Sequence, residues 1–188
     1  MLSGMLNEET MLLLDATNYA AEAHCNQRRK GADKRPYVNH CIWVSQAVAA
    51  CGDVHATVHV LCAAMLHDTV EDTSVSDEAL RQRFGDTIAD LVAEVTDDRT
   101  LPKATRKALQ VEHAGGISAG ACLIKIADKI SNVRDLALDP PPDWSRSRVL
   151  EYVYWAERVV SALAYQQPAL MVDFRAACDQ TRAAFGAS

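Results

Sequence analysis

Residues 58–73 read Val-His-Val-Leu-Cys-Ala-Ala-Met-Leu-His-Asp-Thr-Val-Glu-Asp-Thr, an apolar run that ends in polar and acidic side chains. The adjacent His67 and Asp68 are costly to bury without a partner, and a metal ion is the usual partner for such a pair. Glu71 and Asp72 follow at i+4 from His67 and Asp68, so a helix places all four on one side. A metal-binding pair with two further carboxylates is the composition of a hydrolytic centre.

Apolar residues recur at helical spacing along most of the chain, and strand patterns are nearly absent. The clearest helical stripe comprises Val149, Tyr152, Val153, Ala156, Val160 and Leu163. The sequence therefore predicts an all-α fold with a central metal site. About nine helices are expected, at residues 7–26, 37–51, 54–71, 77–84, 86–96, 102–113, 118–138, 145–165 and 168–184. The length favours one domain, residues 1–188.

Composition and charge restrict the class of protein. No segment has the basic start and apolar core of a signal peptide, and no apolar run reaches the roughly 18 residues of a membrane span. The six cysteines are scattered without a Cys-x-x-Cys pair, which favours a cytoplasmic protein over a disulfide framework. The net charge is −6, so we do not expect duplex nucleic acid as a partner. Because no apolar run is long enough to span a bilayer, we expect no membrane partner either.

Two basic clusters interrupt this acidic chain. They consist of Arg28, Arg29, Lys30, Lys34 and Arg35, and of Arg99, Lys103, Arg106 and Lys107. Each cluster taken alone is more often a solvated surface. The more specific interpretation is a local site for a small polyphosphate on an otherwise acidic protein. We interpret Asp97 and Asp98, just before the second cluster, as a solvated helix end.

Two further segments complete the candidate metal centre. His40 opens a helix after Pro-Tyr-Val-Asn, and Asp128 and Asn132 share one face of a later helix at i, i+4. His40, His67, Asp68 and Asp128 together offer two imidazoles and two carboxylates. That mixed set suits Mn²⁺, Fe²⁺ or Zn²⁺ better than Ca²⁺. A single histidine of this kind is more often a hydrogen-bonded core residue, but the combined pattern favours metal binding.

The pattern His…His-Asp…Asp resembles the HD phosphohydrolase superfamily, whose members are all-helical. The segments Arg29-Lys30, 37–40, 66–73 and 125–132 are similar to the hydrolase domain of the RelA/SpoT alarmone enzymes. The segments 95–103 and 144–148, the latter Trp-Ser-x-x-Arg, narrow the resemblance to the stand-alone small alarmone hydrolases. The resemblance extends from about residue 10 to 165.

This resemblance implies an activity and a role for each matching residue. The implied activity removes the 3′-pyrophosphate of (p)ppGpp, giving GDP or GTP and pyrophosphate, and so lowers alarmone levels in the stringent response. One Mn²⁺ would be held by His40, His67, Asp68 and Asp128. Glu71 and Asp72 would orient the attacking water and accept its proton. The implied substrate-binding residues are Arg29 against the guanine, Lys30, Lys103 and Arg148 facing phosphates or base, Asn132, and Tyr152, one turn beyond Arg148.

The sequence departs from the family at Cys41, because a proline usually follows the first ligand histidine. We expect the local geometry to survive, since such a proline mainly sets backbone angles. Three alternatives remain within enzymes: hydrolysis of the 2′-phosphate of NADPH, of (p)ppApp, or of pyrophosphate on an RNA 3′ end. A degenerate domain that only binds nucleotides is a further alternative, although the intact carboxylates argue against it. A monomer or weak homodimer acting on a guanosine polyphosphate is expected.

Overall fold

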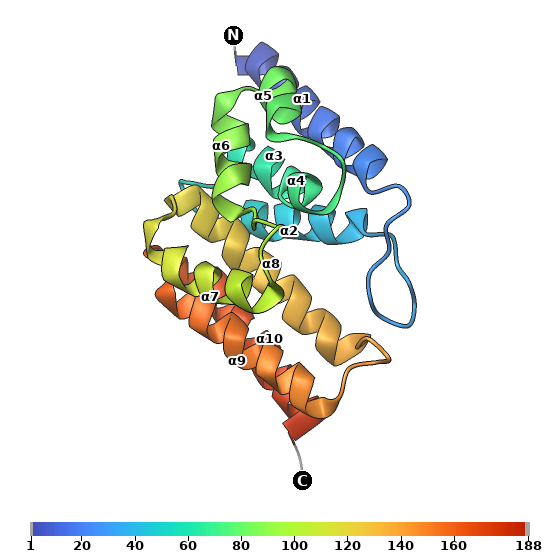
Figure 1. The fold of residues 1–188 in the computed structure, drawn as a ribbon. Helices are drawn as coiled ribbons and strands as arrows, with labels where there is room; N and C mark the ends of the chain where they lie inside the picture. Colours follow the sequence, from blue (N-terminus) through green and yellow to red (C-terminus); the bar gives the residue numbers. More distant parts are fainter. Residues whose placement is uncertain (1, 187–188) are drawn as a thin grey trace.

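The computed structural model describes residues 2–186, which fold into helices (Figure 1). The α-helices are α1 (Leu2–Ala23), α2 (Val38–Ala50), α3 (Val58–Leu66), α4 (Thr69–Asp72), α5 (Asp77–Phe84), α6 (Asp86–Val95), α7 (Lys103–His113), α8 (Ala119–Leu138), α9 (Arg146–Ala162) and α10 (Pro168–Gly186). A short 3-10 helix, Ala114–Gly116, follows α7. Within residues 2–186 the β pairing is limited to one bridge between Arg28 and Pro36. The predicted all-α class is confirmed.

Side-chain caps explain where several helices begin. The hydroxyl groups of Thr57, Ser76, Ser118 and Ser145 each accept a hydrogen bond from the backbone N–H three residues further on. Each bond satisfies a donor that the first turn of a helix leaves free. Gly85, with φ of +82°, separates α5 from α6 in a conformation that favours glycine. These local signals are readable in the sequence, and the predicted helix bounds agree within a few residues there.

The predicted single helix over residues 54–71 is instead broken into α3 and α4 at His67 and Asp68. Two side chains beside the break bond to backbone carbonyls: His67 Nδ1 lies 2.8 Å from the Ala64 oxygen, and Thr69 Oγ1 donates to the Leu66 oxygen at 2.6 Å. Such bonds compete with the helical pattern. Asp68 has φ of −100° and ψ of −2°, which turns the chain before the helical turn α4 begins.

Helix α8 is the central element of the fold. It packs against α2, α3, α6, α9 and α10, and in Figure 1 it crosses the molecule between the upper helices and the pair α9 and α10. Its side chains are buried along most of its length. The close packing on α3 needs small residues: a Cβ at Gly120 would lie 2.8 Å from Cγ2 of Val60. The first turns of α3 and α8 therefore pack at close range.

None of the helices in the described part of the chain is long and apolar enough to cross a membrane.

Candidate active site

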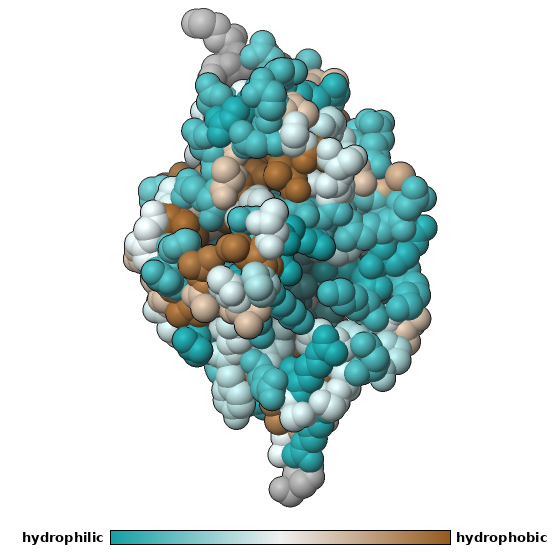
Figure 2. Space-filling model, in the orientation of Figure 1, coloured by the Kyte–Doolittle hydropathy of each residue, from teal (hydrophilic) through white to brown (hydrophobic). Residues whose placement is uncertain are grey.

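A cavity of about 380 Å³ opens where the α3–α4 break faces α8. Figure 2 shows a hydrophilic hollow in the middle of this face of the molecule. Its walls come from the loop before α2, from the turn at residues 67–72, from α8, and from residues in and before α9. Of the residues predicted to form the site, the cavity is lined by Arg29, Lys30, His67, Asp68, Glu71, Asp72, Asp128, Asn132 and Tyr152.

The four predicted metal ligands converge although up to 88 residues separate them in the chain, from His40 to Asp128. The Nε2 atom of His40 lies 3.3 Å from Oδ1 of Asp128 and 3.5 Å from Oδ2 of Asp68. The Nε2 atom of His67 lies 3.0 Å from Oδ2 of Asp68 and 3.9 Å from Oδ1 of Asp128. The ligand atoms of His40, His67 and Asp128 all lie within 4.8 Å of one another, and Oδ2 of Asp68 lies beside both histidines, so an ion held by the first three would have Asp68 next to it.

The hydrogen bonds of both histidines suit them to bind a metal ion. His67 Nδ1 faces the Ala64 carbonyl oxygen, which can only accept, so Nδ1 carries a proton and Nε2 is the ring nitrogen left to bind an ion. His40 Nδ1 lies 2.8 Å from the hydroxyl oxygen of Ser131. Both Nε2 atoms are buried and have no hydrogen-bond partner. Orienting a histidine through its other nitrogen is typical of metal sites.

The charge around these ligands favours a cation. Burial alone would lower the pKa of His67, but the carboxylates of Asp68 and Asp128 outweigh burial and raise it to about 9. The two carboxylates therefore attract positive charge to the centre more strongly than burial repels it. The donor set and its charge fit a divalent transition metal, and the ligand assignment stays a prediction.

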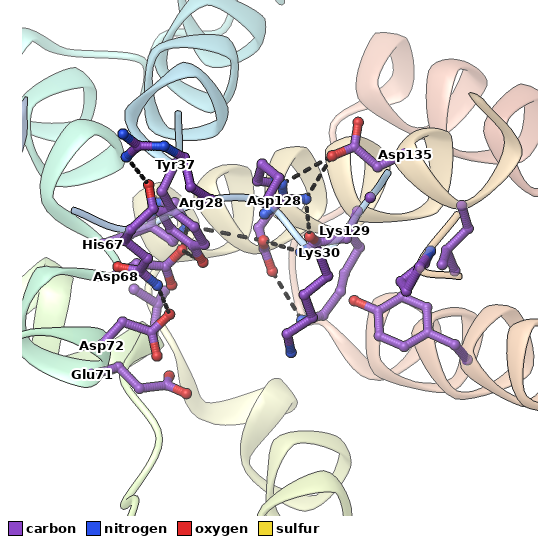
Figure 3. Close-up of a pocket in the computed structure, with 18 of the residues that line it drawn as sticks. Arg28, Lys30, Tyr37, His67, Asp68, Glu71, Asp72, Asp128, Lys129 and Asp135 are labelled. Carbon is purple, nitrogen blue, oxygen red and sulfur yellow. Dashed lines mark hydrogen bonds and ion pairs between the residues drawn. The ribbon is translucent and has the colours of Figure 1, made fainter. Parts of the chain in front are cut away.

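Both aspartates have hydrogen-bond partners behind them. Asp68 Oδ2 accepts a hydrogen bond of 2.7 Å from the Tyr37 hydroxyl group. Asp128 accepts hydrogen bonds from Lys129 Nζ at 2.9 Å and from Asn132 Nδ2 at 2.5 Å. Burial opposes the charge on Asp128, but Lys129 and His40 hold its pKa far below the usual range. Figure 3 shows Asp128 and Lys129 side by side on α8.

The role of Lys129 did not emerge from the sequence. Lys125 and Lys129 are both buried on α8, where apolar residues would be expected. Two lysines at i, i+4 among buried isoleucines are a signal that could have indicated paired charges inside the fold. Lys129 bonds to a carboxylate, whereas Lys125 Nζ donates to the Val95 carbonyl oxygen at 2.9 Å.

Glu71 and Asp72 both line the cavity next to the candidate metal ligands His67 and Asp68 (Figure 3). Glu71 Oε1 lies 3.2 Å from Arg106 Nη1, and Oε2 accepts the backbone N–H of Asp97 at 3.1 Å. Burial and the Asp97 carboxylate raise the pKa of Glu71 to about 7. Asp72 accepts a hydrogen bond of 3.1 Å from Gln27 and pairs with Arg99.

The interpretation of Asp97 as a solvated helix end is wrong. Its side chain is only 14% exposed, and its carboxylate accepts a 2.6 Å hydrogen bond from Gln110 and lies 3.9 Å from Arg106. The loop after α6 therefore folds back and supports Glu71 through backbone and side-chain contacts. Nothing in the local sequence indicates this, because α7 supplies both partners. Asp98, in contrast, is exposed.

The basic residues line a second wall of the cavity. Arg29 donates to Asp135 at 2.9 Å and to Asn132 at 2.6 Å, and its guanidinium lies 5.4 Å from the centre of the Tyr37 ring. These bonds fix the plane of the guanidinium group against α8. Lys30 follows it on the same loop and also lines the cavity.

Lys103 and Arg148 do not line the cavity themselves. Both pack on the ring of Trp144, which does, at 6.0 Å for Lys103 and 4.4 Å for Arg148. Burial, together with Arg148 and Lys30, lowers the pKa of Lys103. The contacts with Trp144 therefore bring the charges of Lys103 and Arg148 together beside the cavity that Lys30 lines.

Known proteins are similar to this chain in sequence and fold. The HD domain family matches residues 16–158. A guanosine-3′,5′-bis(diphosphate) 3′-pyrophosphohydrolase, MESH1, of Xenopus tropicalis is 48% identical over 158 residues, covering 84% of this chain and 88% of that protein. Its Homo sapiens counterpart is 47% identical with the same coverage. A solved structure, described as a metazoan ortholog of SpoT that hydrolyzes ppGpp and plays a role in starvation responses, superimposes with a TM-score of 0.84 at 42% identity, covering 90% of this chain and 94% of that one.

Proposed function

This chain belongs to the HD domain family, and on that premise we propose that it hydrolyses the 3′-pyrophosphate of guanosine 3′,5′-bis(diphosphate). The products would be GDP, or GTP from pppGpp, and pyrophosphate. One observation carries the proposal: three candidate ligands, His67, Asp68 and Asp128, line one cavity together with both candidate catalytic carboxylates, and Nε2 of His40 lies within 3.5 Å of both aspartates. The chain is 47–48% identical to proteins that carry this name.

His40, His67, Asp68 and Asp128 would hold one Mn²⁺, with Lys129, Ser131 and Tyr37 supporting the ligands from behind. Carboxylate oxygens suit Mn²⁺, and the two imidazoles make the set one for a transition metal, not for Ca²⁺. When bound, such an ion lowers the pKa of a water molecule and polarises a phosphoryl oxygen.

Glu71 and Asp72 would orient the attacking water and accept its proton. A base works best when its pKa lies near the working pH, and the pKa of Glu71, at about 7, meets that condition. The contacts of Glu71 with Arg106 and with the Asp97 N–H restrict its rotation. A carboxylate held in this way loses little conformational freedom when the reaction begins.

The basic wall would bind the nucleotide. The flat guanidinium of Arg29, fixed by Asp135 and Asn132, can cover the face of a guanine. Lys30 would face the phosphates or the base, and Lys103 and Arg148, which pack on Trp144 at the cavity edge, would add positive charge that attracts an anion. Tyr152 and Asn132 line the cavity between this wall and the metal centre, where they would contact the ribose or a phosphate.

We infer that the protein is a cytoplasmic enzyme, a single HD domain spanning residues 1–188, and that it lowers alarmone levels in the stringent response. Its partner would be a small guanosine polyphosphate, with no membrane or duplex nucleic acid involved. A monomer or weak homodimer suffices, because this chain alone supplies every side chain that the proposal uses.

The test combines product analysis with metal analysis. The purified protein is incubated with Mn²⁺ and, separately, with ppGpp, ppApp and NADPH, and the products are separated by ion-exchange chromatography. Pyrophosphate and GDP from ppGpp are expected. Orthophosphate from NADPH without turnover of ppGpp would refute this substrate, and no turnover of any nucleotide would indicate a binding domain.

Three variants test the residue roles. Asp68→Ala is expected to lose both bound Mn²⁺ and activity. Asp72→Asn should keep the ion while its rate falls by about 100-fold or more. Asp86→Asn, which changes a surface carboxylate that is 83% exposed, is the matched control and should retain both. Stoichiometric Mn²⁺ in Asp68→Ala would contradict the ligand assignment.

A further inference from the structure

Cys41 lies at the metal centre. It follows His40 in the first turn of α2, and its free thiol is fully buried. All six cysteines of the chain fall within the described residues, and Cys41 alone among them joins a cluster of side chains able to hold an ion. The other five therefore serve as internal comparisons for this thiol.

Cys41 completes a second possible ligand set that overlaps the first. Its sulfur, one nitrogen of His67 and one carboxylate oxygen of Asp68 all lie within 4.8 Å of one another. A separate observation indicates that this place binds a ligand: Nε2 of His67 is buried without a satisfied hydrogen bond and lies 3.0 Å from Oδ2 of Asp68, another member of the set. His67 is only 4% exposed, so water does not satisfy that nitrogen from outside.

We propose that Cys41 is a further ligand of the metal centre, used through its thiolate when the centre holds a thiophilic ion such as Co²⁺, Zn²⁺ or Cd²⁺. The inference rests on the proposed metal centre and adds a residue to it. As the bond between sulfur and metal forms, the thiol proton is released to solvent, and nothing is oxidised or reduced. Mn²⁺ would continue to use the nitrogen and oxygen ligands.

The distances allow this change of ligand with a small movement. Zinc lies about 2.3 Å from a thiolate and about 2.0 Å from an imidazole nitrogen, so two ligand atoms on one tetrahedral ion stand roughly 3.5 Å apart. A shift of about 1 Å would bring Cys41 into reach. His67 and Asp68 are shared by both ligand sets, so the ion itself would select between Cys41 and the pair His40 and Asp128.

If Cys41 is a ligand, its thiolate should raise the affinity of the centre for thiophilic ions. Replacing the thiol with a hydroxyl group should remove that gain in affinity. We expect Cys41→Ser to weaken binding of Co²⁺ and Cd²⁺ by about tenfold or more, because a soft ligand is replaced by a hard one. Its affinity for Mn²⁺ should change by less than about twofold. Cys178→Ser removes an equally buried thiol from α10 and is the matched control.

The experiment reads the metal–sulfur bond directly. Metal is removed with a chelator, Co²⁺ is added, and the near-ultraviolet absorption band of thiolate-to-Co²⁺ charge transfer is recorded. The wild type and Cys178→Ser should show the band, and Cys41→Ser should lack it. Bound Co²⁺ without the band in the wild type, or a band that persists in Cys41→Ser, would overturn the role of Cys41.

Two further measurements separate the possible failures. If Co²⁺, Cd²⁺ and Mn²⁺ all fail to bind the wild type, the metal centre itself is refuted, and Cys41 with it. If Cys41→Ser does not fold, ¹¹³Cd NMR of the wild type decides instead. A chemical shift in the thiolate range supports the ligand, and a shift in the oxygen and nitrogen range excludes it.

Discussion

Replacing Lys129 with methionine should destabilise the protein, and a bound divalent ion should restore part of the loss. Lys129 Nζ lies 2.9 Å from Oδ2 of Asp128, and their side chains are 5% and 13% exposed. Burial opposes both charges, but each group favours the other's ionised form: the pKa of Lys129 is raised and that of Asp128 lowered. The contribution of the pair is therefore present above the unfolded pKa of aspartate and below that of lysine, so pH 7.5 lies within the window.

The size of the stability loss depends on the contacts that Asp128 retains when Lys129 is replaced. Removing one partner of a buried ion pair costs about 3–5 kcal/mol, because the other charge stays buried without compensation. Asp128 retains the hydrogen bond from Asn132 and the two histidine rings, so we expect the lower end, about 3 kcal/mol. Methionine preserves most of the packing of the lysine stem. For a protein of this size, the loss corresponds to roughly 10 °C in Tm.

The assay is urea unfolding at pH 7.5, first with a chelator and then with saturating Mn²⁺. Lys125→Met is the matched control, because it removes a buried lysine one turn earlier whose partner is a neutral carbonyl. Loss of this hydrogen bond should lower the free energy of unfolding by about 1–2 kcal/mol. Mn²⁺ bound at Asp128 replaces the missing positive charge, so the deficit of Lys129→Met should shrink with metal. The reasoning would be refuted if the two variants lost the same free energy of unfolding in chelator. It would also be refuted if Mn²⁺ left the stability deficit of Lys129→Met unchanged.

Three further predictions concern the base, the packing of α8 and the basic wall. Burial and Asp97 raise the pKa of Glu71 to about 7. Since a base must be deprotonated, kcat/KM should fall about tenfold for each pH unit below 7, and this limb should be missing from the pH profile of Glu71→Gln. In Gly120→Ala the new Cβ would lie 2.8 Å from Val60 Cγ2, so the free energy of unfolding should fall by about 1–3 kcal/mol. Thermal unfolding measures this change, and an increased Tm would contradict the prediction. Arg29→Ala should raise KM for ppGpp by an amount equivalent to about 1–3 kcal/mol, and an unchanged KM would exclude Arg29 from the site.

Much of the fold was readable from the sequence because its signals are local. Helix starts at Ser76, Ser118 and Ser145 depend on a bond to a residue three positions away. The break at His67 and Asp68 was not predicted, because it depends on more than local signals. The apolar run predicts a helix, and whether side chains compete for the carbonyls of Ala64 and Leu66 depends on which rotamers the surrounding core allows.

The all-α class and the chemical composition of the candidate site, two imidazoles with the acidic residues around His67 and Asp128, follow from the order of the residues. The other groups that surround them depend on how the helices pack. Asp97 reaches Glu71 and Cys41 approaches His67, because α2 and α6 pack against α3 beside the α3–α4 break. The physical reason is that spacing along one helix fixes which of its own side chains share a face. Contacts between helices depend instead on how the buried surfaces fit together, and no local pattern encodes that fit.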